Sequence, residues 1–271
     1  DLSVSTSLEV YENLSKNKSD RYEFIYPNYK VIKNINLKEK SYNDLSFSSY
    51  GYQKNYETNI FESTIINDLL LTSDTKIFEG GLKYNYSGIL KNVNLDAKNS
   101  TTYKNKFDQS LMSSIMLTGE YPLKKGGEIY ESNIIPKLSI MYSPNKTKNM
   151  INDDRRIDVN NVFSFNRIAA NDTVEGGTSL TVGAEYKKTD KNNYNELINL
   201  NLATVIRQKE NGDLPIRSSI GKKTSDIFGS IKVKPNKNFS LNYNFAIDNN
   251  MNKSNYDGIN TKFSVNNFVT S

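Results

Sequence analysis

The sequence predicts an all-β protein, built as an antiparallel up-and-down sheet in which consecutive strands are neighbours. Apolar and polar residues alternate along most of the chain, and turn-forming residues separate the alternating segments. In addition, the chain contains 18 Tyr and 12 Phe although only 36% of its residues are hydrophobic. Disordered chains of low hydrophobicity are poor in aromatic residues, so this composition favours an ordered sheet.

The alternation is clearest over residues 239–248, and residues 1–11 and 197–207 follow the same pattern. Successive side chains of a strand point to opposite faces, whereas a helix would scatter these residues around its axis. The segment therefore predicts a strand with one apolar and one polar face. The apolar face comprises Phe239, Leu241, Tyr243, Phe245 and Ile247, and the polar face comprises Ser240, Asn242, Asn244, Ala246 and Asp248.

About 12 strands follow one another along the chain. Turn sequences such as Lys124-Lys125-Gly126-Gly127 and Asn211-Gly212-Asp213 lie between them. The strands recur every 20 to 25 residues or so, a longer spacing than the 8–12 residues of a soluble sandwich. The predicted strands lie near 1–11, 21–35, 43–53, 59–72, 77–95, 109–121, 131–143, 174–187, 197–207, 225–234, 239–248 and 259–270.

Strand length and polarity favour a membrane sheet. From Phe239 to Ile247 a strand is about 27 Å long and, tilted by ~40°, covers roughly 21 Å, close to the ~25 Å apolar band of an outer-membrane barrel. The polar face suits a wet interior. We predict an antiparallel up-and-down transmembrane β-barrel wall, with residues 1–271 as one segment of a larger, incomplete barrel. Its interior-facing residues would include Asn199, Asn201, Asn242 and Asn244.

Both ends of the sequence lie at alternating segments: Asp1 opens directly into one, and Ser271 follows another. We therefore expect the chain to be a piece of a longer one. An extended soluble antiparallel sheet or solenoid is the alternative fold. A mean hydropathy of −0.64 excludes a helical membrane protein, which needs about 18 consecutive apolar residues per span.

The composition excludes several kinds of chemistry. The chain has no Cys, His or Trp, so it cannot use Ser-His-Asp or Cys-His catalysis, a zinc site of the usual nitrogen and sulfur ligands, or a disulfide. We expect no enzymatic activity and no cofactor or metal. The net charge of +5 is spread along the chain and does not predict nucleic-acid binding.

Residues 133–186 carry the most distinctive pattern. A proline inside a strand pattern marks a strand start or weakens strand pairing, because it lacks a backbone donor. Further on, charged residues flank a Gly-Gly pair, and we expect them to pair and to hold this loop against the interior face or the rim. The residues of the pattern are Pro136, Asn161, Phe163, Asn166, Arg167, Asp172, Glu175, Gly176, Gly177, Gly183 and Tyr186.

This stretch resembles the C-terminal barrel domain of the LptD (organic-solvent-tolerance) family, which assembles lipopolysaccharide in the Gram-negative outer membrane. The resemblance implies a non-enzymatic transport component that inserts lipopolysaccharide into the outer leaflet, passing the sugar through a hydrophilic interior and the acyl chains sideways into outer-membrane lipids. It also implies an LptE-type lipoprotein plug inside the barrel and a periplasmic bridge protein reached through a jelly-roll domain. That domain and the terminal barrel strands have no counterpart in this sequence. The alternative function is a porin-like or receptor-type barrel for passive or plugged solute passage.

Overall fold

The computed structural model describes residues 1–16, 18–35, 37, 43–265 and 268–270. The chain divides into two compact units. The first comprises Asp1–Asp74, Ser87–Ile115 and Ala170–Val174, and the second comprises Thr75–Tyr86, Met116–Ala169 and Glu175–Ser271. Among the described residues, no helix is long and apolar enough to cross a membrane.

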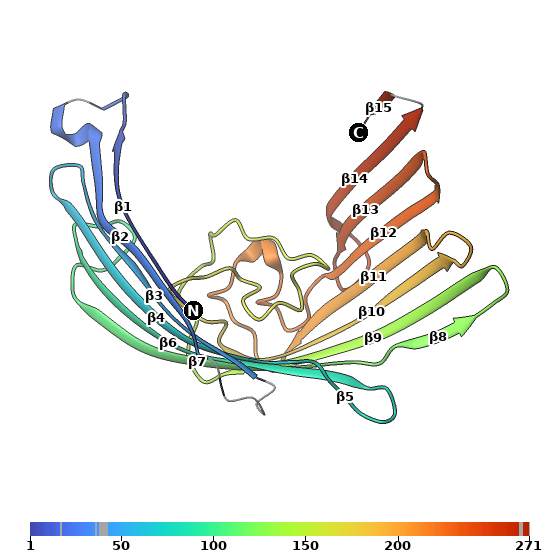
Figure 1. Ribbon diagram of the computed structural model, residues 1–271. Helices are drawn as coiled ribbons and strands as arrows, with labels where there is room; N and C mark the ends of the chain where they lie inside the picture. The colour runs from blue at the N-terminus through green and yellow to red at the C-terminus, as the bar shows by residue number, and fades with distance from the viewer. Residues whose placement is uncertain (17, 36, 38–42, 266–267, 271) are drawn as a thin grey trace. The chain divides into compact units, whose positions relative to one another are not determined.

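The structure is an antiparallel sheet of 15 strands, of which β5, β8 and β15 are short (Figure 1). The pairing order is β1-β2-β3-β4-β6-β7-β9-β10-β11-β12-β13-β14-β15, with β5 on β6 and β8 on β9. Within the described ranges β1 and β15 end this order and do not pair with each other, so the sheet is not closed. The strands are β1 (Leu2–Glu12), β2 (Tyr22–Ile35), β3 (Asn43–Tyr56), β4 (Ile60–Ser73), β5 (Lys76–Ile77), β6 (Lys83–Lys98), β7 (Asp108–Glu120), β8 (Leu123–Gly126), β9 (Tyr130–Ser143), β10 (Gly177–Asp190), β11 (Glu196–Arg207), β12 (Ile227–Asn236), β13 (Phe239–Ile247), β14 (Ser254–Val265) and β15 (Phe268–Thr270), and two 3-10 turns cover Lys18–Arg21 and Ile216–Ser218.

The predicted all-β, antiparallel up-and-down class is confirmed, and the open sheet is consistent with an incomplete barrel. Three local predictions were wrong. The single strand predicted near 259–270 covers the second half of β14 and all of β15, which pair with each other antiparallel, and residues 266 and 267 between them lie outside the described residues. The single strand predicted over 77–95 is broken, because the chain turns between β5 and β6 at Gly81, whose φ of +85° suits glycine. The turn predicted at Lys124–Gly127 lies further along, since residues Leu123–Gly126 form β8 and the chain reverses where Gly127 bonds to Tyr130.

Pro136 lies in the middle of β9, opposite Ala184 of β10, and does not start a strand. On its other side the Tyr121 N–H donates to the Pro136 carbonyl (3.1 Å). In such a pair the two residues normally exchange two hydrogen bonds, but proline has no N–H to return the second. The gap between β7 and β8 coincides with this missing bond, so Pro136 interrupts the pairing rather than the strand.

Burial follows the alternation of side chains within a strand. In β9, Leu138, Ile140 and Tyr142 are exposed, while the intervening Ser139 and Met141 are buried. In β11, Leu202 and Ile206 are exposed, whereas Ala203, Val205 and Arg207 are buried. The exposed side chains of these strands are therefore mostly apolar, and the opposite face is covered.

A small apolar core interrupts the otherwise polar covered face in the first unit. Ile66 of β4, Val93 of β6 and Met112 of β7 form this cluster together with Val174, from the loop segment Ala170–Val174. Tyr50, Ile89 and Leu95 pack against its edge. The sequence predicted a wet interior face, but apolar side chains are favourable here because a loop segment removes them from water.

Replacing Met112 with Ala should loosen this loop segment. Truncating a buried Met costs about 2–5 kcal/mol, and Met112 is only 7% exposed. We expect faster hydrogen exchange at the backbone amides of residues 170–174, measured by mass spectrometry. The control is Leu111→Ala, because Leu111 is 62% exposed on the other face of β7. Equal exchange in the two variants would contradict the assignment of Val174 to this core.

Candidate functional site

The loop between β9 and β10, residues 144–176, contains no strand (Figure 1), yet several of its side chains are buried like those of a core segment. Ile157, Val162 and Ile168 are each at most 2% exposed. Loops normally run over the surface, because buried backbone groups need partners. Some of these partners are backbone groups of the β11–β12 loop. The Met150 N–H donates to the Asp213 carbonyl (2.8 Å), and the Ile216 N–H donates to the Ile151 carbonyl (3.2 Å).

Arg167 holds the loop to the strands of the second unit. Its Nε and Nη2 donate to the two carboxylate oxygens of Glu175 at 2.7 and 2.5 Å, a bidentate ion pair. Its remaining donors reach Thr181 Oγ1 and Ser179 Oγ of β10, each at 2.8 Å, and the Val162 carbonyl at 3.2 Å. The side chain is 1% exposed, so this geometry satisfies a fully buried guanidinium.

A second arginine completes the group. Arg207, at the end of β11 and 2% exposed, lies opposite Ser179 in the strand pairing. Its Nη1 donates to Glu175 Oε1 at 2.5 Å, and its Nη2 donates to the Gly176 carbonyl. One carboxylate therefore serves two buried guanidinium groups. We call Arg167, Glu175 and Arg207 the Arg–Glu–Arg cluster.

The cluster keeps Glu175 ionised. Burial alone would raise the pKa of Glu175, but the charges and hydrogen bonds of Arg167 and Arg207 outweigh it and hold that pKa below its usual 4.5. Glu175 lies in the loop, just before β10 begins. Its negative charge is therefore a permanent part of the structure near neutral pH.

Glycines allow the loop to approach the strands closely. A Cβ at Gly176 would clash with the backbone carbonyl of Asn145, and the Gly176 N–H donates to Thr147 Oγ1 at 2.8 Å. Gly177 has a φ of +86°, a conformation that side chains disfavour. The Gly-Gly pair is thus required by geometry at this point in the chain.

Gly183 makes room for Phe163. A Cβ at Gly183 would lie 2.9 Å from Phe163 Cζ, so the ring sits against the bare backbone of β10. The ammonium of Lys137 lies 4.7 Å from the ring centroid. Asn161 shapes the preceding turn by accepting from Asp158 N (3.0 Å) and donating to the Arg156 carbonyl (3.2 Å).

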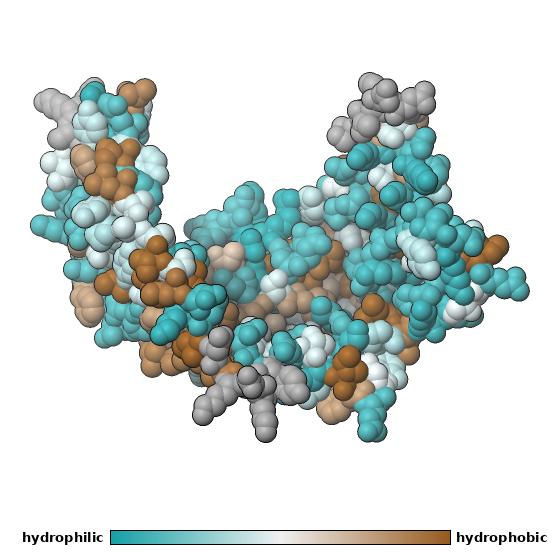
Figure 2. Space-filling view, viewed as in Figure 1, coloured by the Kyte–Doolittle hydropathy of each residue, from teal (hydrophilic) through white to brown (hydrophobic). Residues whose placement is uncertain are grey.

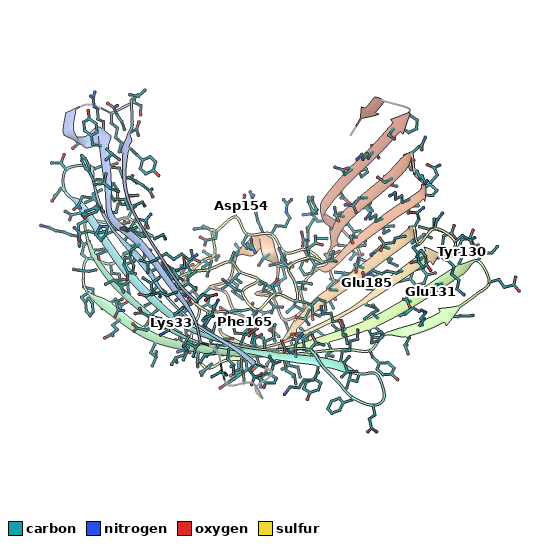
Figure 3. All side chains as sticks on the ribbon, viewed as in Figure 1. Lys33, Tyr130, Glu131, Asp154, Phe165 and Glu185 are labelled. Atoms are coloured by element: carbon teal, nitrogen blue, oxygen red, sulfur yellow. The ribbon has the colours of Figure 1, made fainter. Side chains whose placement is uncertain are left out.

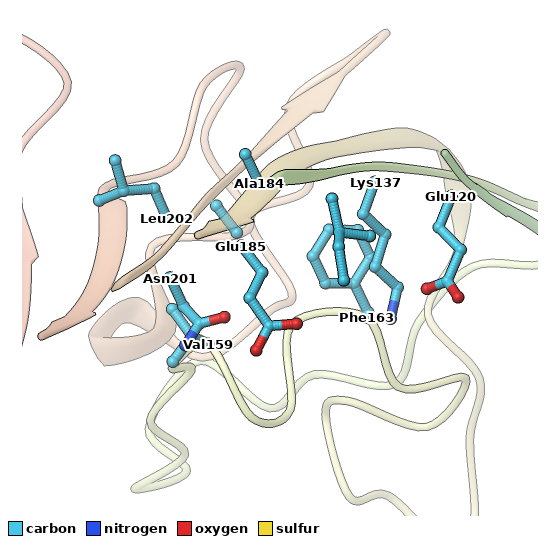
Figure 4. A pocket seen from close by; sticks show the side chains of 10 residues that line it. Glu120, Lys137, Val159, Phe163, Ala184, Glu185, Asn201 and Leu202 are labelled. Carbon is cyan, nitrogen blue, oxygen red and sulfur yellow. The ribbon is translucent and has the colours of Figure 1, made fainter. Parts of the chain in front are cut away.

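A cavity of about 200 Å³ lies beside Phe163, between the loop and the strands. Figure 4 shows Lys137 and Phe163 side by side, with the carboxylates of Glu120 and Glu185 on either side of them. Asn201 also lines this cavity. The cavity is polar, and its groups can form hydrogen bonds; the part of the chain that the structure describes offers no cluster of three or more acidic residues for a metal ion.

The first unit holds its own loop segment by a separate contact. The Lys91 ammonium, 4% exposed, donates to both Asp68 oxygens (2.7 and 2.8 Å) and to the Asn171 carbonyl (2.7 Å). The Tyr50 hydroxyl also donates to that carbonyl at 3.1 Å. Asp172, grouped with Arg167 and Glu175 in the sequence, belongs to this unit, and its charge acts on Tyr103, whose pKa is raised chiefly by burial.

The remaining residues of the sequence pattern lie apart from the Arg–Glu–Arg cluster. Tyr186 and Pro136 lie on the other face of the second unit, since Tyr186 pairs with Ile134 and Leu200, and Pro136 pairs with Ala184. Asn166 supports a turn through its carbonyl, which accepts from Ala169 N (3.0 Å). Sequence reasoning missed Arg207 and Lys91, which lie far along the chain from the loop residues they bind.

The strand register places the four predicted asparagines on one face. Asn199 is opposite Lys232, which is opposite Asn242. In the adjacent row Asn201 is opposite Ser230, which is opposite Asn244. Directly opposed residues share a face, and this is the face that carries Arg207 further along β11. We call these two rows the asparagine rows.

Replacing Glu175 with Gln should destabilise the protein by about 3–5 kcal/mol, because two buried arginines would lose the negative charge that they share. A lower midpoint of urea unfolding in detergent would measure this loss. Asp154→Asn is the matched control: Asp154 lies on the exposed part of the same loop (Figure 3), where it pairs with Arg217. Such an exposed pair contributes less than about 1 kcal/mol. Equal effects would contradict a structural role for the buried cluster.

The stability that Glu175 contributes should depend on pH. Because its pKa is lower in the folded protein than the usual 4.5, this contribution is complete above about pH 4.5 and is lost as the pH falls through the folded-state value. The measurement is the difference in urea midpoint between the wild type and Glu175→Gln across this range. The difference should shrink on acidification; a difference that grows would refute the lowered pKa.

The comparisons with known proteins identify the family. A sequence profile of LptD, LPS transport system D, matches residues 78–271, which is well over half of the chain. No curated protein matches the chain. The matched range includes the loop between β9 and β10 and strands β6–β15. The chain therefore belongs to the LptD family of lipopolysaccharide transport proteins, a family of the outer membrane.

Proposed function

We propose that this chain is a wall segment of an outer-membrane β-barrel that inserts lipopolysaccharide into the outer leaflet. The observation that carries the proposal is the two-faced sheet of the second unit. Exposed Leu138, Ile140 and Leu202 lie on one face, and Asn199, Asn201 and Arg207 lie on the other. Such a sheet presents hydrocarbon to lipid and hydrogen-bonding groups to an enclosed aqueous path.

The two faces fit the two halves of the substrate. Lipopolysaccharide joins acyl chains to a saccharide, so it needs an apolar and a polar environment at the same time. The polar face would carry the saccharide, and the acyl chains would pass sideways into outer-membrane lipids. No step in this transport requires a bond to be made or broken, which agrees with a chain that lacks His and Cys.

The loop between β9 and β10 would control how much of the polar face is open. The Arg–Glu–Arg cluster fixes one end of this loop, and Phe163 on Gly183 fixes its middle. An LptE-type lipoprotein plug would share the interior with the loop. A periplasmic bridge protein would deliver the substrate through a jelly-roll domain outside residues 1–271.

The test is the charge reversal Arg167→Glu. It would place two carboxylates together in a buried site, so we expect impaired barrel assembly and increased sensitivity of the cells to large antibiotics. The measurements are the amount of heat-modifiable barrel in outer membranes and the antibiotic inhibitory concentrations. The control is Arg217→Glu, at an exposed ion pair, which should change neither.

Unaltered assembly and permeability in Arg167→Glu would refute the proposed role of the loop. The alternative of a porin-like barrel makes a different prediction. It would conduct ions in planar bilayers, and its depletion would leave the surface lipopolysaccharide unchanged.

A further inference from the structure

The polar face of β13 and β14 carries the amide side chains of Asn242, Asn244 and Asn260. The register extends the asparagine rows by one strand, because Asn242 is opposite Asn260 and Asn244 is opposite Gly258. On β11, Asn199 and Asn201 are engaged: Asn199 donates to Glu185 (3.2 Å), and Asn201 donates to Asn199 (2.5 Å). In the described part of the chain no side-chain hydrogen bond is seen for Asn242, Asn244 or Asn260.

Tyr256 adds an aromatic ring to the same surface. It is opposite Ala246, so it shares the face of the asparagine rows. Its side chain leans along β14 over Gly258, where a Cβ would clash with the Tyr256 hydroxyl. The ring therefore lies low on the strand, with its hydroxyl beside the position of Asn244. We call Asn242, Asn244, Tyr256 and Asn260 the amide strip.

Cations surround the amide strip. The Arg156 guanidinium lies 4.1 Å from the Tyr256 ring centroid. Lys232 is opposite Asn242, and Lys262 is opposite Ser240, one row further along. Lys232 lies 3.8 Å from Glu196, and among the described residues no ion pair is seen for Lys262. Asp257 lies on the other face, where it accepts from the Tyr243 hydroxyl (2.5 Å).

These groups suit an anionic sugar. Carboxamides can donate to and accept from hydroxyl groups at once, and the tyrosine hydroxyl does the same. The ammonium and guanidinium groups bind phosphate or carboxylate through stronger, charge-assisted hydrogen bonds. In Figure 2, the visible surface over β12–β14 is mostly hydrophilic, so it is not an apolar docking patch.

We propose that the amide strip, with Lys232 and Lys262, is a binding site for a saccharide that bears phosphate or carboxylate groups. The proposal rests on the proposed function, since it names the part of lipopolysaccharide that would contact these strands. The amides bind the hydroxyl groups, and the two lysines select the charged substituent. Binding is non-covalent and releases the saccharide unchanged.

The first experiment maps contacts with a photoreactive amino acid placed at single positions of the full protein in cells. Positions 244 and 260 should give ultraviolet-dependent adducts with lipopolysaccharide. Positions 243 and 259 are the matched controls, because Tyr243 and Ile259 lie opposite each other on the other face. Adducts between position 244 and a protein would overturn the proposal, because they would show that a lipoprotein plug covers the strip.

A further position separates the two proposals. Glu185 lies in the row of Asn201 and lines the cavity beside Phe163. Adducts with lipopolysaccharide at 185 but not at 244 or 260 would overturn the amide-strip proposal and leave the transport function intact. Adducts at none of these positions would count against both.

The second experiment measures affinity with the full protein purified in detergent, using deacylated lipopolysaccharide oligosaccharide, its dephosphorylated form and inorganic phosphate. Asn242→Ala and Asn244→Ala should each weaken binding of both oligosaccharides about fivefold, the effect of one lost neutral hydrogen bond. Lys232→Ala with Lys262→Ala should weaken binding of the phosphorylated form about tenfold or more and leave the dephosphorylated form nearly unchanged.

Two exposed turn residues provide the controls. Asn192→Ala and Lys237→Ala remove the same functional groups from the surface and should leave all affinities unchanged. Equal losses in the strip and control variants would overturn the proposal, and so would lysine variants that weaken both oligosaccharides alike. Binding of inorganic phosphate as tight as that of the oligosaccharide would overturn it too, because the amides would then contribute nothing.

Discussion

The structure depends on a constraint of the extended chain: in a strand, every second side chain faces the same way. A shift of one residue in pairing would exchange the apolar and polar faces of a whole strand. The register shifts in the second unit lie near strand ends, after Lys188 in β10, after Val233 in β12 and after Ala246 in β13. The central rows from Asn199 to Asn242 and from Asn201 to Asn244 are thereby kept on one face.

The polar face of the second unit changes in character along the strands. At one end it is dry and clamped, because Arg207 and Ser179 are buried beneath the loop with Arg167 and Glu175. At the other end it is open, with half-exposed asparagines and exposed lysines. Burying ionic groups costs desolvation energy, so the Arg–Glu–Arg cluster adds little net stability over an apolar replacement. What the cluster does in this structure is join the loop to the strands, because Glu175 binds Arg167 of the loop and Arg207 of β11 at once.

Local patterns in the sequence were sufficient to predict most of the strands and their two faces. The alternation of Phe239–Ile247 and the turn residues around it depend only on neighbours in the chain, and β13 covers those residues. The prediction failed where a contact joins distant residues. Arg207 binds Glu175 from another strand, and Lys91 binds the Asn171 carbonyl from β6. Nothing in the spacing of either residue signals such a partner, whereas Asp172 was placed with Arg167 only because it is close in sequence. The signal that the sequence did offer was a cationic residue at a strand position on the covered face, as at Lys91 in β6 and Arg207 in β11. Such a residue needs a partner, but its position does not say which one.

The most direct test of this account is the environment of single cysteines along β13, for which the cysteine-free chain is a ready background. Cysteines at 241, 243 and 245 and at 242 and 244 would be labelled with a spin probe in the full protein reconstituted in lipid bilayers. At the odd positions, which face lipid, the account predicts that dissolved oxygen speeds the relaxation of the spin label more than a water-soluble nickel complex does. At the even positions, which face water, the nickel complex should have the larger effect. The same environment at odd and even positions would contradict the two-faced wall.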